Sequence, residues 1–306
     1  MKRWLRYAAF ALAVGFLLWT FVNASWLAPK PVGRPGLIAH RAAPPEIGRC
    51  DTAPGAARYP VLPDNSLAAI TDARQLGAAM ITVEIAADGT LAPARCAGSY
   101  GANPTLGQVA NTAKPKPLLF RFAKGADAAA AERLTADLKA IGRDPVAAHD
   151  AFYAPDEAGA IARMRALLPR AWVFSAQSSA ACRDAYRQSG WTGFLPTACK
   201  GATMMIPLDG QGSLAGWPDR LLSRMESAGG RVIMVAGTEQ GGEVDGDPRG
   251  LDLPEQFGEI PDSFNGFIWV DDIWNLAPAL FPGQDVRRRA EQDAGEAAVK
   301  ARRAAR

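Results

Sequence analysis

Short apolar runs alternate with amphipathic helical segments along most of the chain, and this alternation predicts an α/β fold. Eight such runs across one continuous stretch favour a (β/α)8 TIM-type barrel, preceded by one N-terminal transmembrane or signal helix. The length of 306 residues fits one barrel with appendages. A doubly wound sheet is the competing architecture, but no GxGxxG motif follows the first apolar run.

Each expected strand is short, apolar and followed by a polar or glycine-containing segment. In chain order the expected strands are Leu37–Ala39, Ile81–Ile85, Leu118–Phe122, Val146–Ala148, Trp172–Phe174, Phe194–Leu195, Val232–Val235 and Phe267–Val270. The helical segments between them carry apolar residues at spacings of three and four, and several end at glycine. Examples are SLAAITDARQLG, AAAAERLTADLKAIG, EAGAIARMRALLP, SAACRDAYRQSG and PDRLLSRMESAGG. Residues Lys200–Trp217 are expected to form a long glycine-containing loop.

The N-terminal segment, residues 1–27, has the pattern of an export signal or a membrane anchor. Lys2, Arg3 and Arg6 precede an apolar stretch that runs from Tyr7 to Val22. This stretch is short for a spanning helix and long for the core of a signal peptide. Val22-Asn23-Ala24 resembles a cleavage site, so a secreted, cleaved form is the alternative. We favour a single-pass anchor with the barrel on the extracytoplasmic, periplasmic side.

The rest of the chain divides into a linker at 28–36, the barrel at 37–281 and a charged low-complexity tail at 282–306. Apolar residues make up 48% of the sequence, which indicates a globular protein. The net charge of +3 is small and no nucleic-acid motif is present, so nucleic acid is not an expected partner.

The four cysteines, Cys50, Cys96, Cys182 and Cys199, have no CxxC spacing, which argues against a zinc site. In an oxidising compartment they can form two disulfides, and four free thiols are the alternative. We expect Cys50 to pair with Cys96, because both follow neighbouring strands at one end of the barrel. Cys182 with Cys199 is the remaining pair.

The chain contains only two histidines, His40 and His149, and each follows an apolar run that is expected to be a strand. Side chains at the carboxyl ends of barrel strands point into the ligand site. Histidine also titrates near neutral pH, so it can move a proton there. We therefore expect both imidazoles at the carboxyl end, with a structural role as the alternative for each.

Several motifs resemble the glycerophosphodiester phosphodiesterase family. LIAHRAAPPE resembles its His-Arg-Gly strand end, and DNSLAAITDARQLGAAMITVEIAADGTLAP resembles its acidic-Asn-Thr turn, its Glu-x-Asp strand end and its Lys-Asp-Gly turn. NPTLGQVANT and FIWVDDIWNLAPAL resemble a later helix start and the end of the eighth strand. The resemblance spans roughly Gly36 to Phe281 and implies phosphodiester cleavage at the top of the barrel, by acid–base catalysis with a divalent cation.

By residue, the resemblance makes His40 the first catalytic histidine, Arg41 a phosphate ligand, Asn65 the asparagine of the helix-opening turn and Glu84 a metal ligand. The pattern then fails at three positions. Ala86 replaces the expected aspartate, and Arg95-Cys96 stands where the second catalytic histidine should be. The Glu-x-Lys end of the third strand reads FRFAK, so Arg121 or Phe122 replaces the glutamate, and Lys124 keeps the lysine in the second register.

These losses argue against an ordinary metal-dependent site. Ca²⁺ and Mg²⁺ need several oxygen ligands, and Glu84 alone would hold either cation weakly. An inward-pointing Arg121 would repel the cation. We therefore expect no cofactor, with weak Ca²⁺ or Mg²⁺ binding as the alternative. Asp271 and Asp272 are expected to cap a helix and anchor a loop rather than to form an acid pair.

Three functions remain open for the barrel. The first is a membrane-tethered phosphodiesterase with a rebuilt, metal-poor site, in which His40, Arg41 and His149 are catalytic and Arg121 and Lys124 join Arg41 in binding substrate. Such a site would resemble that of the bacterial phosphoinositide-specific lipases. The second, which we favour, is a pseudoenzyme that binds a phosphodiester or phospholipid-derived ligand, or an unidentified protein partner. The third is a structural component of the envelope.

Overall fold

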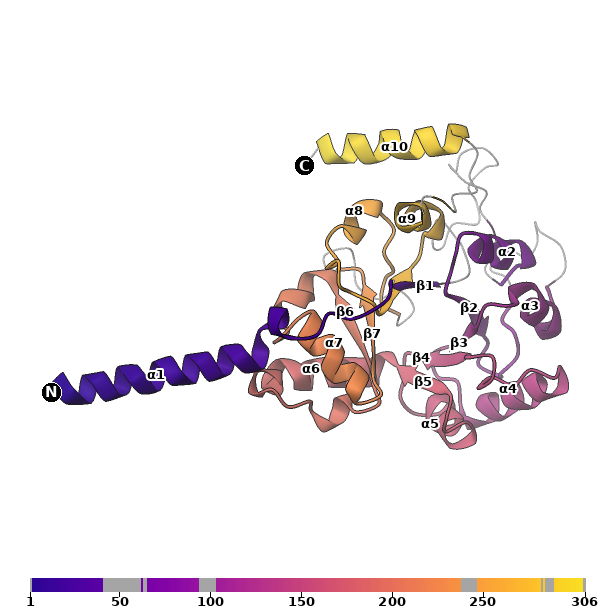
Figure 1. Ribbon diagram of the computed structural model, residues 1–306. Coiled ribbons are helices and arrows are strands. Elements are labelled where there is room, and N and C mark those ends of the chain that lie inside the picture. Colours follow the sequence, from indigo (N-terminus) through magenta and orange to yellow (C-terminus); the bar gives the residue numbers. More distant parts are fainter. Residues whose placement is uncertain are drawn as a thin grey trace.

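Eight parallel strands form a nearly closed barrel with helices on its outside (Figure 1). The computed structural model describes residues 2–40, 62, 65–93, 103–237, 247–281, 283 and 289–304. The strands are β1 (Gly36–Ala39), β2 (Met80–Ile85), β3 (Leu118–Phe122), β4 (Ala151–Ala154), β5 (Trp172–Ser175), β6 (Thr203–Pro207), β7 (Arg231–Val235) and β8 (Phe267–Val270). The fold class expected from the sequence is confirmed.

The sheet order is β5-β4-β3-β2-β1-β8-β7-β6, so β5 and β6 are its two edges. Side chains cross the seam between these edges. The indole Nε1 of Trp172 in β5 donates to the hydroxyl of Thr203 in β6 at 2.8 Å, and Arg183 donates to the carbonyl of Met205 at 3.3 Å. Such bonds satisfy polar groups that a strand edge would otherwise expose.

The helices follow the strands in alternation, apart from one at each end of the chain. They are α1 (Lys2–Asn23), α2 (Leu67–Gln75), α3 (Leu106–Ala113), α4 (Ala128–Ala140), α5 (Ala160–Leu167), α6 (Ala176–Ser189), α7 (Asp219–Ser227), α8 (Pro254–Phe257), α9 (Ile273–Leu280) and α10 (Arg289–Ala304). Side-chain caps begin several of them, as when the Thr105 hydroxyl accepts from the Gln108 amide at the start of α3. α10 lies in the expected tail, and half of its 16 residues are charged or carry a side-chain amide.

Two of the expected strands were wrong. Residues 145–149 form a turn, because the Asp144 carboxylate accepts hydrogen bonds from the amides of Val146 and Ala147, and β4 begins only at Ala151. Phe194 and Leu195 lie between two 3-10 helices, and the sixth strand is Thr203–Pro207. The segment expected to be one long loop from Lys200 to Trp217 therefore contains β6.

The apolar interior has two layers, one between the sheet and the helices and one inside the barrel. Inside the barrel lie Ile38, Met80, Leu119, Ala151, Tyr153, Phe174, Met205, Ile233, Val235 and Trp269. Side chains alternate between the faces of a strand, so residues two or four positions beyond these also point inward. By this rule His40, Glu84, Arg121 and Asp271 face the axis at the carboxyl end of the barrel.

Helix α1 is long and apolar enough to cross a membrane, over Arg3–Asn23, and no residue of its most apolar 18-residue window is buried in the protein. A signal sequence passes the same test, so this finding supports a signal or an anchor without choosing between them. Figure 1 shows α1 projecting away from the barrel, which it meets only at its C-terminal end.

Cys182 in α6 and Cys199 form a disulfide with a Cα–Cα distance of 4.7 Å. This bridge ties α6 to the segment that leads into β6, beside the seam of the barrel. Cys50 and Cys96, the other expected pair, lie outside the described residues.

Candidate functional site

His40 and Asp271 meet because strand register places them opposite each other. β1 and β8 are paired so that Ala39 is the partner of Val270, and each residue of interest comes one position later. The His40 amide donates to the Val270 carbonyl at 2.8 Å, which continues the ladder by one bond. The His40 Nδ1 lies 2.6 Å from Asp271 Oδ1, a short, charge-assisted contact.

The same logic pairs Glu84 with Arg121. These residues are direct register partners in β2 and β3, and both side chains point into the barrel. One guanidinium nitrogen of Arg121 lies 3.7 Å from Glu84 Oε1. Arg121 of the third strand therefore lies in the site, and its side chain is only 5% exposed. This is the first of the two registers considered from the sequence.

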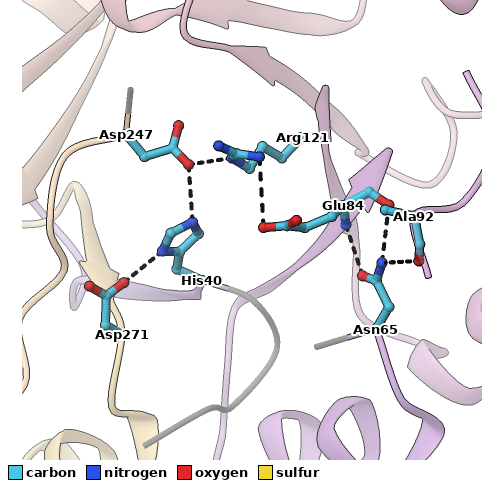
Figure 2. A network of polar contacts seen from close by, with 7 residues as sticks. All are labelled: His40, Asn65, Glu84, Ala92, Arg121, Asp247 and Asp271. Atoms are coloured by element: carbon cyan, nitrogen blue, oxygen red, sulfur yellow. Dashed lines mark hydrogen bonds and ion pairs between the residues drawn. The ribbon is translucent and has the colours of Figure 1, made fainter. Parts of the chain in front are cut away.

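Asp247, from the segment between β7 and β8, joins the two pairs (Figure 2). Its Oδ2 accepts a hydrogen bond from Arg121 Nε and also lies 3.4 Å from His40 Nε2. The other oxygen, Oδ1, has no hydrogen-bond partner among the described residues, although the side chain is only 1% exposed. One carboxylate oxygen thus sits between two nitrogen donors.

Asn65 holds the end of β2 in place and does not cap helix α2. Its side-chain amide donates to the carbonyls of Glu84 and Ala92 at 3.1 and 2.9 Å, and its oxygen accepts from the Glu84 amide at 2.8 Å. The helix cap is the neighbouring Ser66, whose hydroxyl accepts from Ala69. Asn65 has a φ of 60°, a left-handed conformation that asparagine tolerates better than most residues.

The carboxylates around His40 control its charge. Burial alone would lower the pKa of His40, but the negative charge of Asp271 and the contact with Asp247 outweigh that effect and raise its pKa to about 9. His40 is therefore protonated at neutral pH. Burial likewise acts to raise the pKa of Asp247, and the nearby His40 and Arg121 hold it below its ordinary value.

A fourth carboxyl group nearby behaves differently. Burial, together with the charges of Asp271 and Asp272, raises the pKa of Asp252 to about 7. Asp271 also accepts from the Gly250 amide at 2.8 Å, and Asp272 caps α9 by accepting from the Asn275 amide. The two roles expected for Asp271 and Asp272 are both present, and Asp271 is a member of the site as well.

His149 does not belong to this site. It precedes β4, so it lies at the amino-terminal end of the barrel, where it is exposed and has a φ of 58°. The expectation that it stands at a carboxyl strand end was wrong, because the apolar residues before it form a turn. Next to it the buried Asp150 takes two hydrogen bonds from Arg143, both 2.6 Å long, and one from the Leu118 amide.

Two of the expected site residues remain to be placed. Lys124 is exposed in the turn that follows β3. Arg41 lies outside the described residues. Sequence reasoning left out Asp247 altogether and gave Asp271 only an anchoring role. The carboxyl-end rule could have found Asp271, since it directly follows an expected strand, whereas no periodic pattern marks Asp247.

The residues present do not fit the divalent cation that the family resemblance implies. The Arg121 guanidinium lies beside Glu84, the one expected ligand, and would repel a cation there. Within the described ranges, His, Cys, Asp and Glu side chains form no group of three that could hold a metal ion. The site's positive charge comes from Arg121 and His40.

A cavity of about 180 Å³ opens next to this cluster. Pro248 and Arg249, which directly follow Asp247, line it together with Arg183 and Ser179 of α6. The Ser179 hydroxyl is buried and has no hydrogen-bond partner among the described residues. Two of the residues that line the cavity, Arg183 and Arg249, are positively charged.

No protein-family model matches the chain, and no curated protein matches it in sequence. The resemblance to glycerophosphodiester phosphodiesterases therefore stays an expectation that rests on the sequence motifs described above.

Proposed function

We propose that the carboxyl end of this barrel binds a phosphate-bearing ligand, such as a phosphodiester or a phospholipid-derived head group, with little or no turnover. One observation carries the proposal: a single carboxylate oxygen, Asp247 Oδ2, is shared by His40 Nε2 and Arg121 Nε. The His40 contact is an ion pair and the Arg121 contact is a hydrogen bond. A phosphate oxygen carries similar charge and can accept from both nitrogens, so it can take this position by displacing the Asp247 carboxylate. The adjacent cavity has room for the rest of the ligand.

Low turnover follows from the protonation state and number of the imidazoles. The chain has only two histidines, and the second lies at the opposite end of the barrel. His40 is protonated at neutral pH, so it cannot also accept a proton from an attacking hydroxyl. A site that has one charged imidazole and no fitting metal site lacks two of the groups that the family's chemistry requires.

A second candidate is metal-independent phosphodiester hydrolysis, and the His40–Asp271 pair favours it. A carboxylate bound to one imidazole nitrogen orients the ring and stabilises its charged form. In this reading a water molecule attacks the phosphorus and releases its proton to solvent. The protonated His40 gives its proton to the leaving oxygen as the phosphorus–oxygen bond breaks, and Arg121 neutralises the phosphate in place of a cation. This reaction would persist in the presence of a chelator.

The first test is ligand-dependent thermal unfolding of the full chain in detergent, with sn-glycerol 3-phosphate as the probe. A ligand at 100 times its Kd stabilises by about 2.7 kcal/mol, which raises the midpoint by several degrees. Arg121→Gln should abolish the rise. Arg143→Gln, which removes an arginine from the opposite end, should retain it. If the unmodified protein gains no stability at any concentration, the proposal is wrong.

The second candidate is tested by following the release of glycerol phosphate from glycerophosphocholine in the presence of EDTA. Binding without release supports the pseudoenzyme. Release that His40→Gln abolishes would support the hydrolase instead. Release that requires Ca²⁺ or Mg²⁺ would contradict both readings.

We also propose that α1 anchors the protein in a membrane as a single pass, with the barrel on the extracytoplasmic side. The basic residues Lys2, Arg3 and Arg6 precede the apolar stretch, which favours a cytoplasmic N-terminus. A barrel held at the membrane surface would lie close to phospholipid-derived ligands. Cleavage after Ala24, followed by secretion, is the alternative.

A further inference from the structure

The C-terminal end of α1 is built into the barrel by polar contacts. The last carbonyls of a helix have no partner within the helix and need donors from elsewhere. Arg224 donates to the Val22 carbonyl at 2.8 Å, and Arg220 donates to the Phe21 carbonyl at 3.2 Å. Positive charge at this end of a helix is also favoured by the helix dipole.

Two further features fix the same junction. The side-chain amide of Asn23 is largely buried and donates to the Trp191 carbonyl at 2.6 Å. Gly193 lies so close to α1 that a Cβ there would come within 2.3 Å of a Val22 methyl carbon. Cleavage after Ala24 would therefore remove one acceptor of Arg224 and the Phe21 carbonyl that accepts from Arg220, and it would remove the Val22 side chain that packs against Gly193.

Exposed aromatic side chains surround this junction. Trp26 follows α1 directly and is 76% exposed, while Trp191 and Phe194, beside the Asn23 and Val22 contacts, are 55% and 80% exposed. We call these three residues the aromatic rim. Large apolar side chains are more often buried than exposed. Three exposed aromatic residues at the point where an apolar helix leaves the barrel therefore indicate a surface that contacts a partner.

A lipid bilayer fits this position best. The rim lies at the end of a helix of 22 residues, about 33 Å long, which matches the thickness of the hydrocarbon core. Tryptophan and other aromatic rings favour the boundary between hydrocarbon and water, because one part of the ring system is apolar and another part forms hydrogen bonds. The Trp191 indole Nε1 donates to the Gln188 carbonyl, which leaves the ring face for apolar contact.

We propose that α1 is retained and that the aromatic rim rests in the interfacial layer of the bilayer that α1 spans. The barrel is then held against the membrane in one orientation. This proposal rests on the anchoring proposed above and is independent of what the barrel binds.

The experiment places the full chain in phosphatidylcholine vesicles that contain lipids brominated near the head group. Bromine quenches only tryptophans that reach the lipid. Subtracting the emission of a Trp191→Phe variant from that of the unmodified chain isolates the emission of Trp191. Trp274→Phe, in α9 on another side of the barrel, is the matched control.

We expect strong quenching of the Trp191 emission and none of the Trp274 emission. The mass of the chain recovered from membranes should correspond to the full 32.4 kDa. A mass that lacks the first 24 residues would overturn the retention of α1. A full-length chain whose Trp191 emission is unquenched would overturn the membrane contact and point to water or a protein partner at the rim. Neither outcome affects the phosphate-binding test.

Discussion

The two ends of the barrel both hold buried ionic groups, but they are organised in different ways. At the amino-terminal end, Arg143 and Asp150 form a two-point pair, and the Leu118 amide supplies a third donor to the same carboxylate. At the carboxyl end, two cations, His40 and Arg121, face three carboxylates, and the second oxygen of Asp247 has no hydrogen-bond partner among the described residues.

The difference indicates what each end does. At the amino-terminal end one cation pairs with one carboxylate and their hydrogen bonds are satisfied, which is typical of a structural ion pair. The carboxyl-end cluster has one more carboxylate than cations and an unsatisfied acceptor, Asp247 Oδ1, and both are costly in a protein interior. Such a cluster is poorly suited to a purely structural role.

Removing the cation at the amino-terminal end should have the largest effect on stability. Arg143→Ala leaves the Asp150 carboxylate buried without its charge partner, and we expect a loss of about 3–5 kcal/mol in the free energy of unfolding. Chemical denaturation measures this loss. Binding of sn-glycerol 3-phosphate by the folded fraction should not change. A loss of binding would mean that the two ends are not independent.

The second prediction concerns pH. The pKa of His40 is about 9 in the folded protein and near 6.5 when unfolded, so its contribution to stability is complete below pH 6.5. That contribution, up to roughly 3 kcal/mol, should be lost as the pH rises from about 6.5 through 9. Denaturation across this range should show the decline in the unmodified chain and a flatter profile in His40→Gln. Equal slopes in both would contradict the charge assigned to His40.

Asp252 is expected to have a smaller effect on the free energy of unfolding. Its charge also lowers stability as the pH rises, but over a lower pH range than that of His40. An acid whose pKa is raised to about 7 by burial favours the unfolded state as the pH rises from about 4 through 7. The full conversion of this shift is about 4 kcal/mol, but Asp252 is only half-buried and water screens its charge, so Asp252→Asn should raise the free energy of unfolding at pH 8 by about 1–2 kcal/mol. At pH 4 the variant and the unmodified chain should be alike. Destabilisation at pH 8 would show that the charged form has a favourable partner.

The smallest effect is expected at the second histidine. His149 is exposed at the amino-terminal end, and His149→Ala should change stability by no more than about 0.5 kcal/mol. Phosphate binding, and any turnover that exists, should be unaffected. A drop in activity with this variant would place an imidazole near His40 and contradict the separation of the two ends.

The sequence predicted the barrel well because most of its strands are short apolar runs between amphipathic helices. It failed at β4, where one aspartate turns an apolar triplet into a loop, and at β6, where the methionine-containing strand follows a glycine. His40, Glu84 and Arg121 could be predicted because each ends a strand or lies near its end. Asp247 could not, since it follows no expected strand and its contacts with His40 and Arg121 join residues far apart in the sequence.

The most direct test of the account is the phosphate affinity of Asp247→Asn at pH 7, measured by calorimetry on the full chain. If Asp247 Oδ2 occupies the position of a ligand oxygen, removing its charge should strengthen phosphate binding about tenfold, or roughly 1.4 kcal/mol. Asp252→Asn, which removes a nearby carboxylate without vacating that position, should have a much smaller effect. Unchanged or weaker binding by a folded Asp247→Asn variant would contradict the claim that this position is a phosphate site.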